Sequence, residues 1–172
     1  LSPIPALSSP GSAQASSPQL FDVTISLHSS PATDTERAPY EHIIEYFADG
    51  VYEASNGAHK IRKVSIYTGG DFADKADVVW VANCHPSAPI SGRAVQGDHV
   101  NMCDAFGGTN FLQNDWGWQG GGYTLAHEWG HYFYSLYDEY RGDPSYDNIF
   151  HFPHSTDDPV PNSMMNNQWN AR

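Results

Sequence analysis

Alternating hydrophobic and polar residues mark several short segments of the chain, and one longer segment repeats its apolar residues at helical spacing. Phe21–His28 alternates and is rich in β-forming residues, which predicts a first strand. The apolar residues of Pro39–Ala54 recur at helical spacing, which predicts an amphipathic helix with Pro39 in its first turn. Ile61–Tyr67 and Ala76–Ala82 follow as predicted strands. This order predicts an α+β fold in which a helix packs on one face of a mixed, twisted sheet.

The second half of the chain is richer in glycine and in aromatic residues. Val100–Phe106 predicts a short strand at the edge of the sheet. Trp116–Tyr123 contains four glycines and two tryptophans, which predicts a flexible entry to the next helix. Thr124 is a suitable N-cap for that helix, because its hydroxyl can accept a hydrogen bond from a free backbone N–H, and the helix would extend to Tyr134.

The length of 172 residues is typical of one domain with a substantial core. Residues 1–20 are rich in Ser, Pro and Ala, which predicts a flexible tail. Residues 21–172 would then form the domain. We divide it into an N-terminal subdomain over residues 21–134 and a small, loop-rich C-terminal subdomain over residues 135–172, where Pro, Asp and Asn are frequent.

The chain is strongly acidic, with 8 Lys and Arg against 20 Asp and Glu, and a formal net charge of −12. Such a surface repels nucleic acid and anionic membranes, so we expect neither as a partner. No apolar stretch is long enough to span a bilayer, and we therefore expect no membrane insertion.

Two cysteines, Cys84 and Cys103, leave two possibilities open. In a secreted protein they would form one disulfide, closing a loop of about 20 residues and stabilising the fold by roughly 3 kcal/mol on the chain-entropy model. In a cytosolic protein they would be two buried thiols. We favour the disulfide and an extracellular location. The chain does not begin with Met and shows no signal peptide, so we interpret it as a mature or excised fragment.

The run His127-Glu128-Trp129-Gly130-His131 carries the clearest chemical signal of the chain. Positions i and i+4 of a helix share one face, so the two histidines can direct their imidazoles at one metal ion. Glu128 stands beside them, where its carboxylate can polarise a metal-bound water. These groups are the ones that hydrolysis of a peptide bond requires.

A catalytic zinc site usually has three protein ligands, and Asp138 follows His131 closely enough to be the third. A continuous helix would place Asp138 about 10 Å along the axis from His131, too far to share an ion. We therefore expect the helix to end after His131 and the chain to bend back beneath the metal. Tyr134-Ser135-Leu136 occupies this bend without a glycine, and a left-handed Ser135 would cost about 1 kcal/mol, which a metal site can offset.

The segment HEWGHYFYSLYDEY is similar to the HEWAH…FDEY segment of the CLCA proteins, the calcium-activated chloride channel regulators. It also resembles the HExGH…LxDEY segment of the bacterial immunoglobulin A peptidases. The CLCA likeness extends upstream and covers roughly residues 40 to 140. Three short segments carry it there: Tyr52–Ala54, Lys63–Ile66 and Ala76–Val79.

Both families are metzincin-like zinc metalloproteases, so the resemblance implies a zincin or metzincin-like fold with Zn²⁺ as cofactor. It matches His127, His131 and Asp138 to the metal ligands. It matches Glu128 to the general base that takes a proton from the metal-activated water. The CLCA pattern has a glycine where this chain has Ser135, so the bend departs from the family as well.

Metzincins also place a methionine-containing turn under the metal, often as Ser-x-Met. Ser163-Met164-Met165 fits this pattern, and Met165 is the match. Its side chain would form an apolar floor beneath the histidines without binding the metal. The alternative is that both methionines are ordinary core residues of a loop. Metzincin domains usually add a further helix after this turn, so we expect the C-terminal subdomain to be shortened or truncated.

Three functions follow from these features. The first is a zinc metalloendopeptidase that cleaves other proteins or peptides, acting as a monomer. The second is a protease domain that processes its own larger precursor, as the CLCA resemblance implies. The third is a zinc-bound binding module without turnover, against which the intact Glu128 argues. Four further histidines would be available for a second metal site, although their spacing does not require one: His85, His99, His151 and His154.

Overall fold

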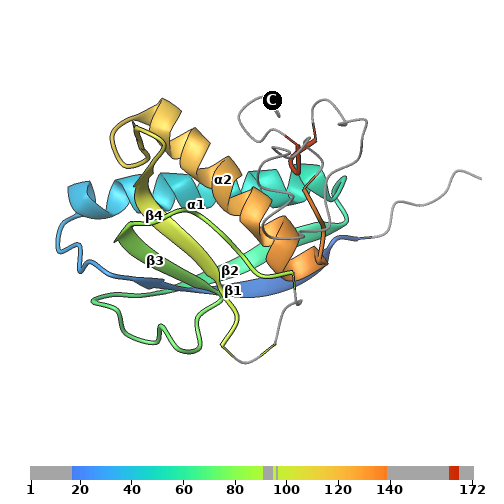
Figure 1. Ribbon diagram of the computed structural model, residues 1–172, viewed down its shortest axis with the longest axis horizontal. Helices are drawn as coiled ribbons and strands as arrows, with labels where there is room; N and C mark the ends of the chain where they lie inside the picture. Colours follow the sequence, from blue (N-terminus) through green and yellow to red (C-terminus); the bar gives the residue numbers. More distant parts are fainter. Residues whose placement is uncertain (1–16, 91–94, 96, 139–162, 167–172) are drawn as a thin grey trace, which may run out of the picture.

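A computed structural model describes residues 17–90, 95, 97–138 and 163–166 of the chain. The elements follow one another as strand, helix, four strands and helix (Figure 1). They are β1 (Gln19–Leu27), α1 (Asp34–Ala54), β2 (His59–Tyr67), β3 (Val78–Asn83), β4 (Val100–Phe106), β5 (Thr109–Asn110) and α2 (Asp115–Tyr134).

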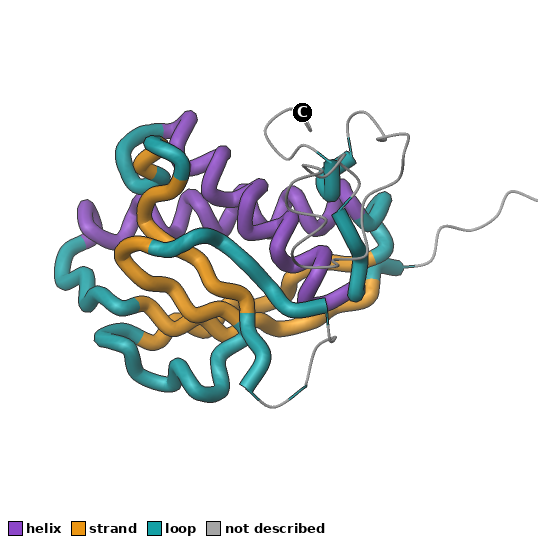
Figure 2. The backbone as a smooth tube through the Cα atoms, viewed as in Figure 1, coloured by secondary structure: helices purple, strands orange, loops and turns teal. Residues whose placement is uncertain are grey.

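The strands form one five-stranded mixed sheet in the order β2-β1-β3-β4-β5. β1 pairs in parallel with both β2 and β3, β3 pairs in parallel with β4, and only the short β5 is antiparallel. Both helices cover the same face of this sheet (Figures 1 and 2). The predicted α+β class and mixed sheet are confirmed. The prediction that Val100–Phe106 lies at the edge is wrong, because β4 pairs on one side with β3 and on the other with β5.

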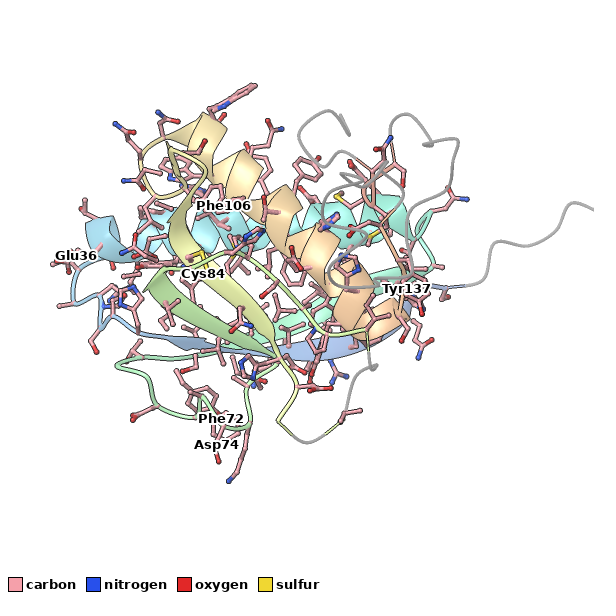
Figure 3. All side chains as sticks on the ribbon, in the orientation of Figure 1. Glu36, Phe72, Asp74, Cys84, Phe106 and Tyr137 are labelled. Atoms are coloured by element: carbon pink, nitrogen blue, oxygen red, sulfur yellow. A yellow bond between two sulfur atoms is a disulfide. The ribbon has the colours of Figure 1, made fainter. Side chains whose placement is uncertain are left out.

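Helix α1 begins earlier than its apolar pattern predicts. Thr33 is the N-cap, and it forms a capping box with Glu36, whose carboxylate accepts from the backbone N–H of Thr33 in return. This reciprocal pair satisfies free donors of the first turn and fixes the start of the helix. Pro39 therefore lies inside α1, not in its first turn. Glu36 is labelled at this end of the helix in Figure 3.

Helix α2 also begins earlier, at Asp115 with Asn114 as N-cap, so Thr124 is a buried interior residue and not a cap. The glycine-rich stretch predicted as a flexible entry is helical. Its glycines let the two helices approach closely, as Gly122 shows. A Cβ at Gly122 would lie only 2.8 Å from the carbonyl oxygen of Ile43 and 2.9 Å from the amide nitrogen of Phe47. The backbone of α1 thus occupies the space that a side chain would need.

The core between helices and sheet is built on large aromatic side chains. Trp129 of α2 is fully buried and stacks on Phe21 of β1, with 5.7 Å between ring centroids, while Phe47 of α1 meets its ring edge-on. Phe133 stacks on the same Phe21 ring at 5.0 Å. These contacts anchor the last turns of α2 over the beginning of β1 and so fix the position of the residues His127 to His131.

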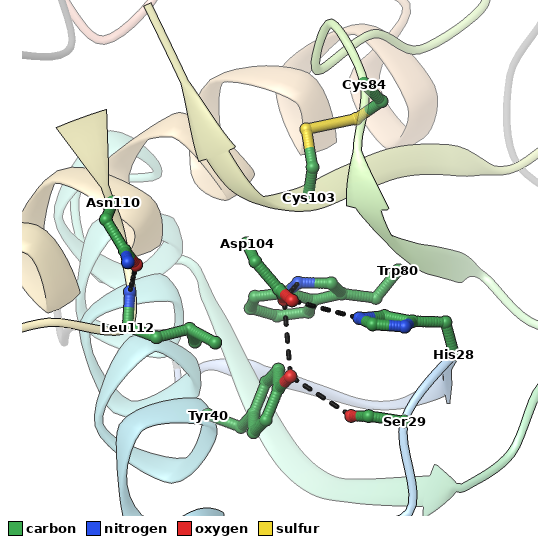
Figure 4. A network of polar contacts seen from close by, with 9 residues as sticks. All are labelled: His28, Ser29, Tyr40, Trp80, Cys84, Cys103, Asp104, Asn110 and Leu112. Carbon is green, nitrogen blue, oxygen red and sulfur yellow. Dashed lines mark hydrogen bonds and ion pairs between the residues drawn. A yellow bond between two sulfur atoms is a disulfide. The ribbon is translucent and has the colours of Figure 1, made fainter. Parts of the chain in front are cut away.

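The opposite end of β1 carries a polar network centred on Asp104 of β4 (Figure 4). One carboxylate oxygen of Asp104 accepts hydrogen bonds from Trp80 Nε1 at 2.9 Å and from the Tyr40 hydroxyl at 3.2 Å. The other lies 3.0 Å from His28 Nε2. Through one side chain, the network joins α1, β3 and β4 to His28, the residue that follows β1. Burial raises the pKa of Tyr40, and the neighbouring Asp104 charge adds to the effect.

Candidate metal centre

His127 and His131 lie one turn apart in the last part of α2, and both are buried, with 5% and 7% of their surface exposed. Their Nε2 atoms are 3.2 Å apart and their ring planes are nearly perpendicular, at 88°. The helical spacing therefore directs both imidazoles at one point, as the sequence predicts.

The chain bends sharply after this pair. α2 ends at Tyr134, and its C-cap Ser135 adopts the left-handed conformation, with φ 56° and ψ 35°. The backbone N–H of Leu136 then donates to the carbonyl of Gly130 at 3.1 Å, which closes the end of the helix. The predicted bend is confirmed, and it is made by a serine where a glycine would be less strained.

The bend returns Asp138 to the two histidines. Its Oδ1 atom lies 3.1 Å from Nε2 of His127 and 3.2 Å from Nε2 of His131. Within the described part of the chain, these three residues are the one group of His, Cys, Asp and Glu with ligand atoms close enough to share a metal ion. His85 and His99 therefore form no second site of this kind with the described residues, and His151 and His154 lie outside them.

Two backbone carbonyls fix the orientation and tautomer of the imidazoles. Nδ1 of His127 lies 2.9 Å from the carbonyl oxygen of Met164, and Nδ1 of His131 lies 2.7 Å from that of Leu136. A carbonyl oxygen can only accept, so each Nδ1 carries the hydrogen and donates it. Each neutral ring then presents an unprotonated Nε2 to the shared point, as metal-binding histidines do.

This arrangement fits a metal ion. Two imidazole lone pairs and a carboxylate oxygen face one another, and the buried Asp138 Oδ1 has no donor among the described residues while both rings carry their hydrogen on Nδ1. A cation satisfies all three atoms at once. Zinc bonds of about 2.0–2.1 Å at tetrahedral angles separate two ligand atoms by about 3.3 Å, close to the separations found here. Two imidazoles and one carboxylate also match the donor set of catalytic zinc sites.

The same groups perturb one another electrostatically when no cation is bound. Burial alone would raise the pKa of Asp138, but hydrogen bonds and positive charge from His127 and His131 outweigh it and hold this pKa well below its usual range. Burial alone would lower the pKa of His131, but Asp138 and the Leu136 carbonyl outweigh it, and the pKa is raised.

Glu128 lies beside the ligands with only 7% of its surface exposed. Burial is the main cause that raises the pKa of Glu128, and the charge of Asp138 adds to it, while His127 and His131 oppose it. The carboxylate also accepts a hydrogen bond from the backbone N–H of Ala88, in the loop after β3. A carboxylate whose pKa is raised is a stronger base than an exposed one, as a general base requires.

Met165 packs against α2 directly beside the ligands. It is buried, and its sulfur contacts the backbone of Gly130, where a Cβ would overlap it. The turn Ser163–Asn166 is held by a hydrogen bond from the N–H of Asn166 to the carbonyl of Ser163 at 3.1 Å. Met165 thus supports the helix between the two histidines. Whether this turn is a metzincin Met-turn stays a prediction.

Cys84 and Cys103 form a disulfide, as favoured from the sequence. Such a bond is typical of oxidising compartments and is consistent with the expected extracellular location. None of the helices in the described ranges is long and apolar enough to cross a membrane. Of the proposed C-terminal subdomain, residues 139–162 and 167–172 lie outside the described residues, as do residues 1–16 of the tail.

Comparison of the chain with models of known families, with curated proteins and with solved structures finds no match. The CLCA resemblance therefore stays a prediction, and the functional argument depends on the geometry of the site. Several groups in that geometry were not predicted from the sequence: the carbonyls of Leu136 and Met164 and the N–H of Ala88. Backbone groups have no sequence signature, so no pattern in the chain would have revealed them.

Proposed function

We propose that this chain is a metzincin-like zinc endopeptidase. The observation that supports it best is the convergence of His127, His131 and Asp138 on one point, with Nε2 and Oδ1 atoms 3.1 to 3.2 Å apart. A buried glutamate directly follows the first ligand. Three protein ligands with a neighbouring carboxylate are the arrangement that metal-assisted hydrolysis requires.

In this proposal each residue has a defined role. Bound zinc would supply Lewis acidity, which favours ionisation of water and polarises the scissile carbonyl. His127, His131 and Asp138 would hold the ion, with the imidazoles oriented by the carbonyls of Met164 and Leu136. Glu128 would take a proton from the attacking water and pass it to the leaving amine. Its raised pKa makes the carboxylate a stronger base for the first of these transfers.

Whether the substrate is another protein or the chain's own precursor is the part of the proposal that depends on the CLCA resemblance. We expect cleavage of an added protein rather than self-processing, because the three metal ligands and the general base are all present within the described residues. A binding module without turnover would have no use for a buried, hydrogen-bonded carboxylate beside the metal. Burying such a group costs stability, and catalysis would explain its retention.

The test pairs metal content with cleavage. We expect about one zinc per purified chain, and cleavage of an unstructured protein such as casein. Glu128→Gln should retain the metal and lose at least about 100-fold in rate, the usual contribution of a general base. Glu45→Gln, on the exposed face of α1, is the matched control and should cleave as the wild type does. Zinc without cleavage of casein by the wild type would favour self-processing or binding. No metal uptake in the presence of zinc would disprove the proposal.

A further inference from the structure

The chain between β3 and β4 follows an unusual path. β3 ends at Asn83, and the next residue, Cys84, is joined to Cys103 of β4 by the disulfide (Figure 4). Side chains alternate along β4, so Cys103 faces away from the helices while Asp104 faces toward them. The disulfide therefore fixes the start of the loop to the sheet face that the helices do not cover.

Beyond the disulfide, the loop pairs with β4. Ser87 and Asn101 form an antiparallel bridge in which each N–H donates to the other's carbonyl, at 3.2 and 2.8 Å. The ring of His85 also lies against that of Phe106, with 4.6 Å between centroids. We call Cys84–Ala88 the anchored segment. The disulfide, the ring contact and the bridge hold it along β4.

The anchored segment directs a single donor at Glu128. Pro86 and Pro89 have no N–H, so the backbone between them offers only the donors of Ser87 and Ala88. Ser87 donates to Asn101. Successive N–H groups of an extended chain point to opposite sides, so that of Ala88 points away from β4, and it donates to the Glu128 carboxylate.

A fixed carboxylate matters for a general base. A glutamate side chain has several rotatable bonds, and a misplacement of about 1 Å at a reacting group can cost about 100-fold in rate. The N–H of Ala88 binds the carboxylate from the anchored segment, whereas Glu128 itself lies on α2. The orientation of Glu128 is thus tied to the sheet through the anchored segment, independently of the metal ligands.

We propose that the anchored segment positions Glu128, and that the Cys84–Cys103 disulfide is its covalent anchor. Reduction of the disulfide would then lower turnover without releasing the metal, because His127, His131 and Asp138 belong to α2 and its bend. Ala88 is a positioning residue that acts through its backbone N–H. The effect on turnover rests on the proposed peptidase function, whereas the hydrogen bond between Ala88 and Glu128 does not.

Amide hydrogen exchange, followed by NMR on the zinc-loaded full chain, tests the hydrogen bond without any substrate. We expect the Ala88 amide to exchange at least about tenfold faster in Glu128→Ala than in the wild type. The Ser87 amide, which donates to Asn101, should be unchanged and is the internal control. In Cys84→Ala/Cys103→Ala the Ala88 amide should also exchange faster. Equal exchange of Ala88 in all three proteins would overturn the proposal.

Kinetics test the positioning role. We expect the double cysteine variant and Ala88→Pro to retain one zinc per chain while kcat falls at least about tenfold with little change in KM. Ala88→Pro keeps the disulfide and removes the donor, so it remains informative if the cysteine variant folds poorly. Ala88→Gly retains the N–H and should behave as the wild type. An unchanged kcat in Ala88→Pro would refute the positioning role. A different result is a wild-type protein in which Glu128 protects the Ala88 amide from exchange but no substrate is cleaved. That result would support the hydrogen bond and contradict the proposed peptidase function.

Discussion

The sulfur of Met165 packs against the backbone of Gly130, one residue before the second histidine of the metal centre. A methyl group at position 130 would overlap this sulfur and lie 3.1 Å from the terminal methyl carbon of Met165. The preceding residue, Met164, supplies the carbonyl that accepts from His127. The fit of Met165 on α2 and the orientation of His127 therefore depend on the same turn.

Gly130→Ala should destabilise the protein although alanine is the better helix former. Replacing the glycine would raise the free energy of unfolding by about 0.5–1 kcal/mol, because alanine loses less conformational entropy on folding. Overpacking against Met165 should lower it by about 1–3 kcal/mol. The overlap should also displace the turn that orients His127 and so weaken metal binding. Denaturant unfolding and zinc titration measure both effects. The double variant Gly130→Ala/Met165→Ala lacks the overlap. Its loss in free energy of unfolding should therefore differ clearly from the sum of the losses in the two single variants. Simple additivity would contradict the packing described.

Metal removal should lower the melting temperature. Zinc at about 100 times its Kd stabilises the folded state by about 2.7 kcal/mol, which corresponds to about 5–10 °C for a chain of this size. Calorimetry before and after chelation, and again after zinc is restored, should show this shift and its reversal. His131→Ala lacks one ligand and should respond far less. A melting temperature indifferent to zinc in the wild type would argue against the metal centre.

Asp104→Asn should destabilise the fold and leave the metal centre intact. Asparagine has one acceptor oxygen where aspartate has two. Its NH₂ group would therefore take the place of the second oxygen and leave one of the three partners, Trp80, Tyr40 or His28, without its acceptor. Loss of such a partner typically costs about 1–3 kcal/mol. Zinc stoichiometry should not change, because this network and the metal centre lie at opposite ends of β1. His28→Ala removes only a partly exposed partner and should cost less; an equal or larger loss would show that Asp104 is not the centre of the network.

Tyr134 should make the protein sensitive to alkaline pH. Burial raises the pKa of Tyr134 to about 12 from an unfolded value near 10, so the neutral hydroxyl is favoured in the folded state. The resulting stability is fully present below pH 10 and is lost as pH rises from 10 through 12. Tyr134→Phe should therefore lose less stability than the wild type between pH 9 and pH 11 in denaturant unfolding. Tyr52→Phe, at an exposed tyrosine, is the control, and identical losses in Tyr134→Phe and the wild type would contradict the prediction.

Much of the sheet could be predicted from the sequence because local patterns specify it. The apolar alternation of β1 and the apolar run of β3 locate both strands to within two residues. The beginning of α1 was missed because Pro39 suggested a first turn, although Thr33 and Glu36 already had capping-box spacing. The two-residue β5 is too short to leave a pattern.

The first half of α2 could not be predicted from local sequence at all. Glycine is unfavourable in a helix, so a stretch with four glycines indicates flexibility when read alone. Gly122 is nevertheless required, because α1 passes too close for any side chain. In the candidate site, His127, His131 and Asp138 were predicted from spacing and the necessary bend. The backbone donor and acceptors around them arise from tertiary structure, which their sequence positions do not reveal.

The carbonyl that orients His127 comes from a residue 37 positions further along the chain. During synthesis, both histidines of α2 therefore leave the ribosome well before Met164, whose carbonyl orients His127. His131 can meet the Leu136 carbonyl as soon as α2 closes, whereas His127 must await the docking of Ser163–Asn166. We expect the site to be assembled in this order during biosynthesis, so that the candidate metal site is completed only when the last described turn of the chain has docked.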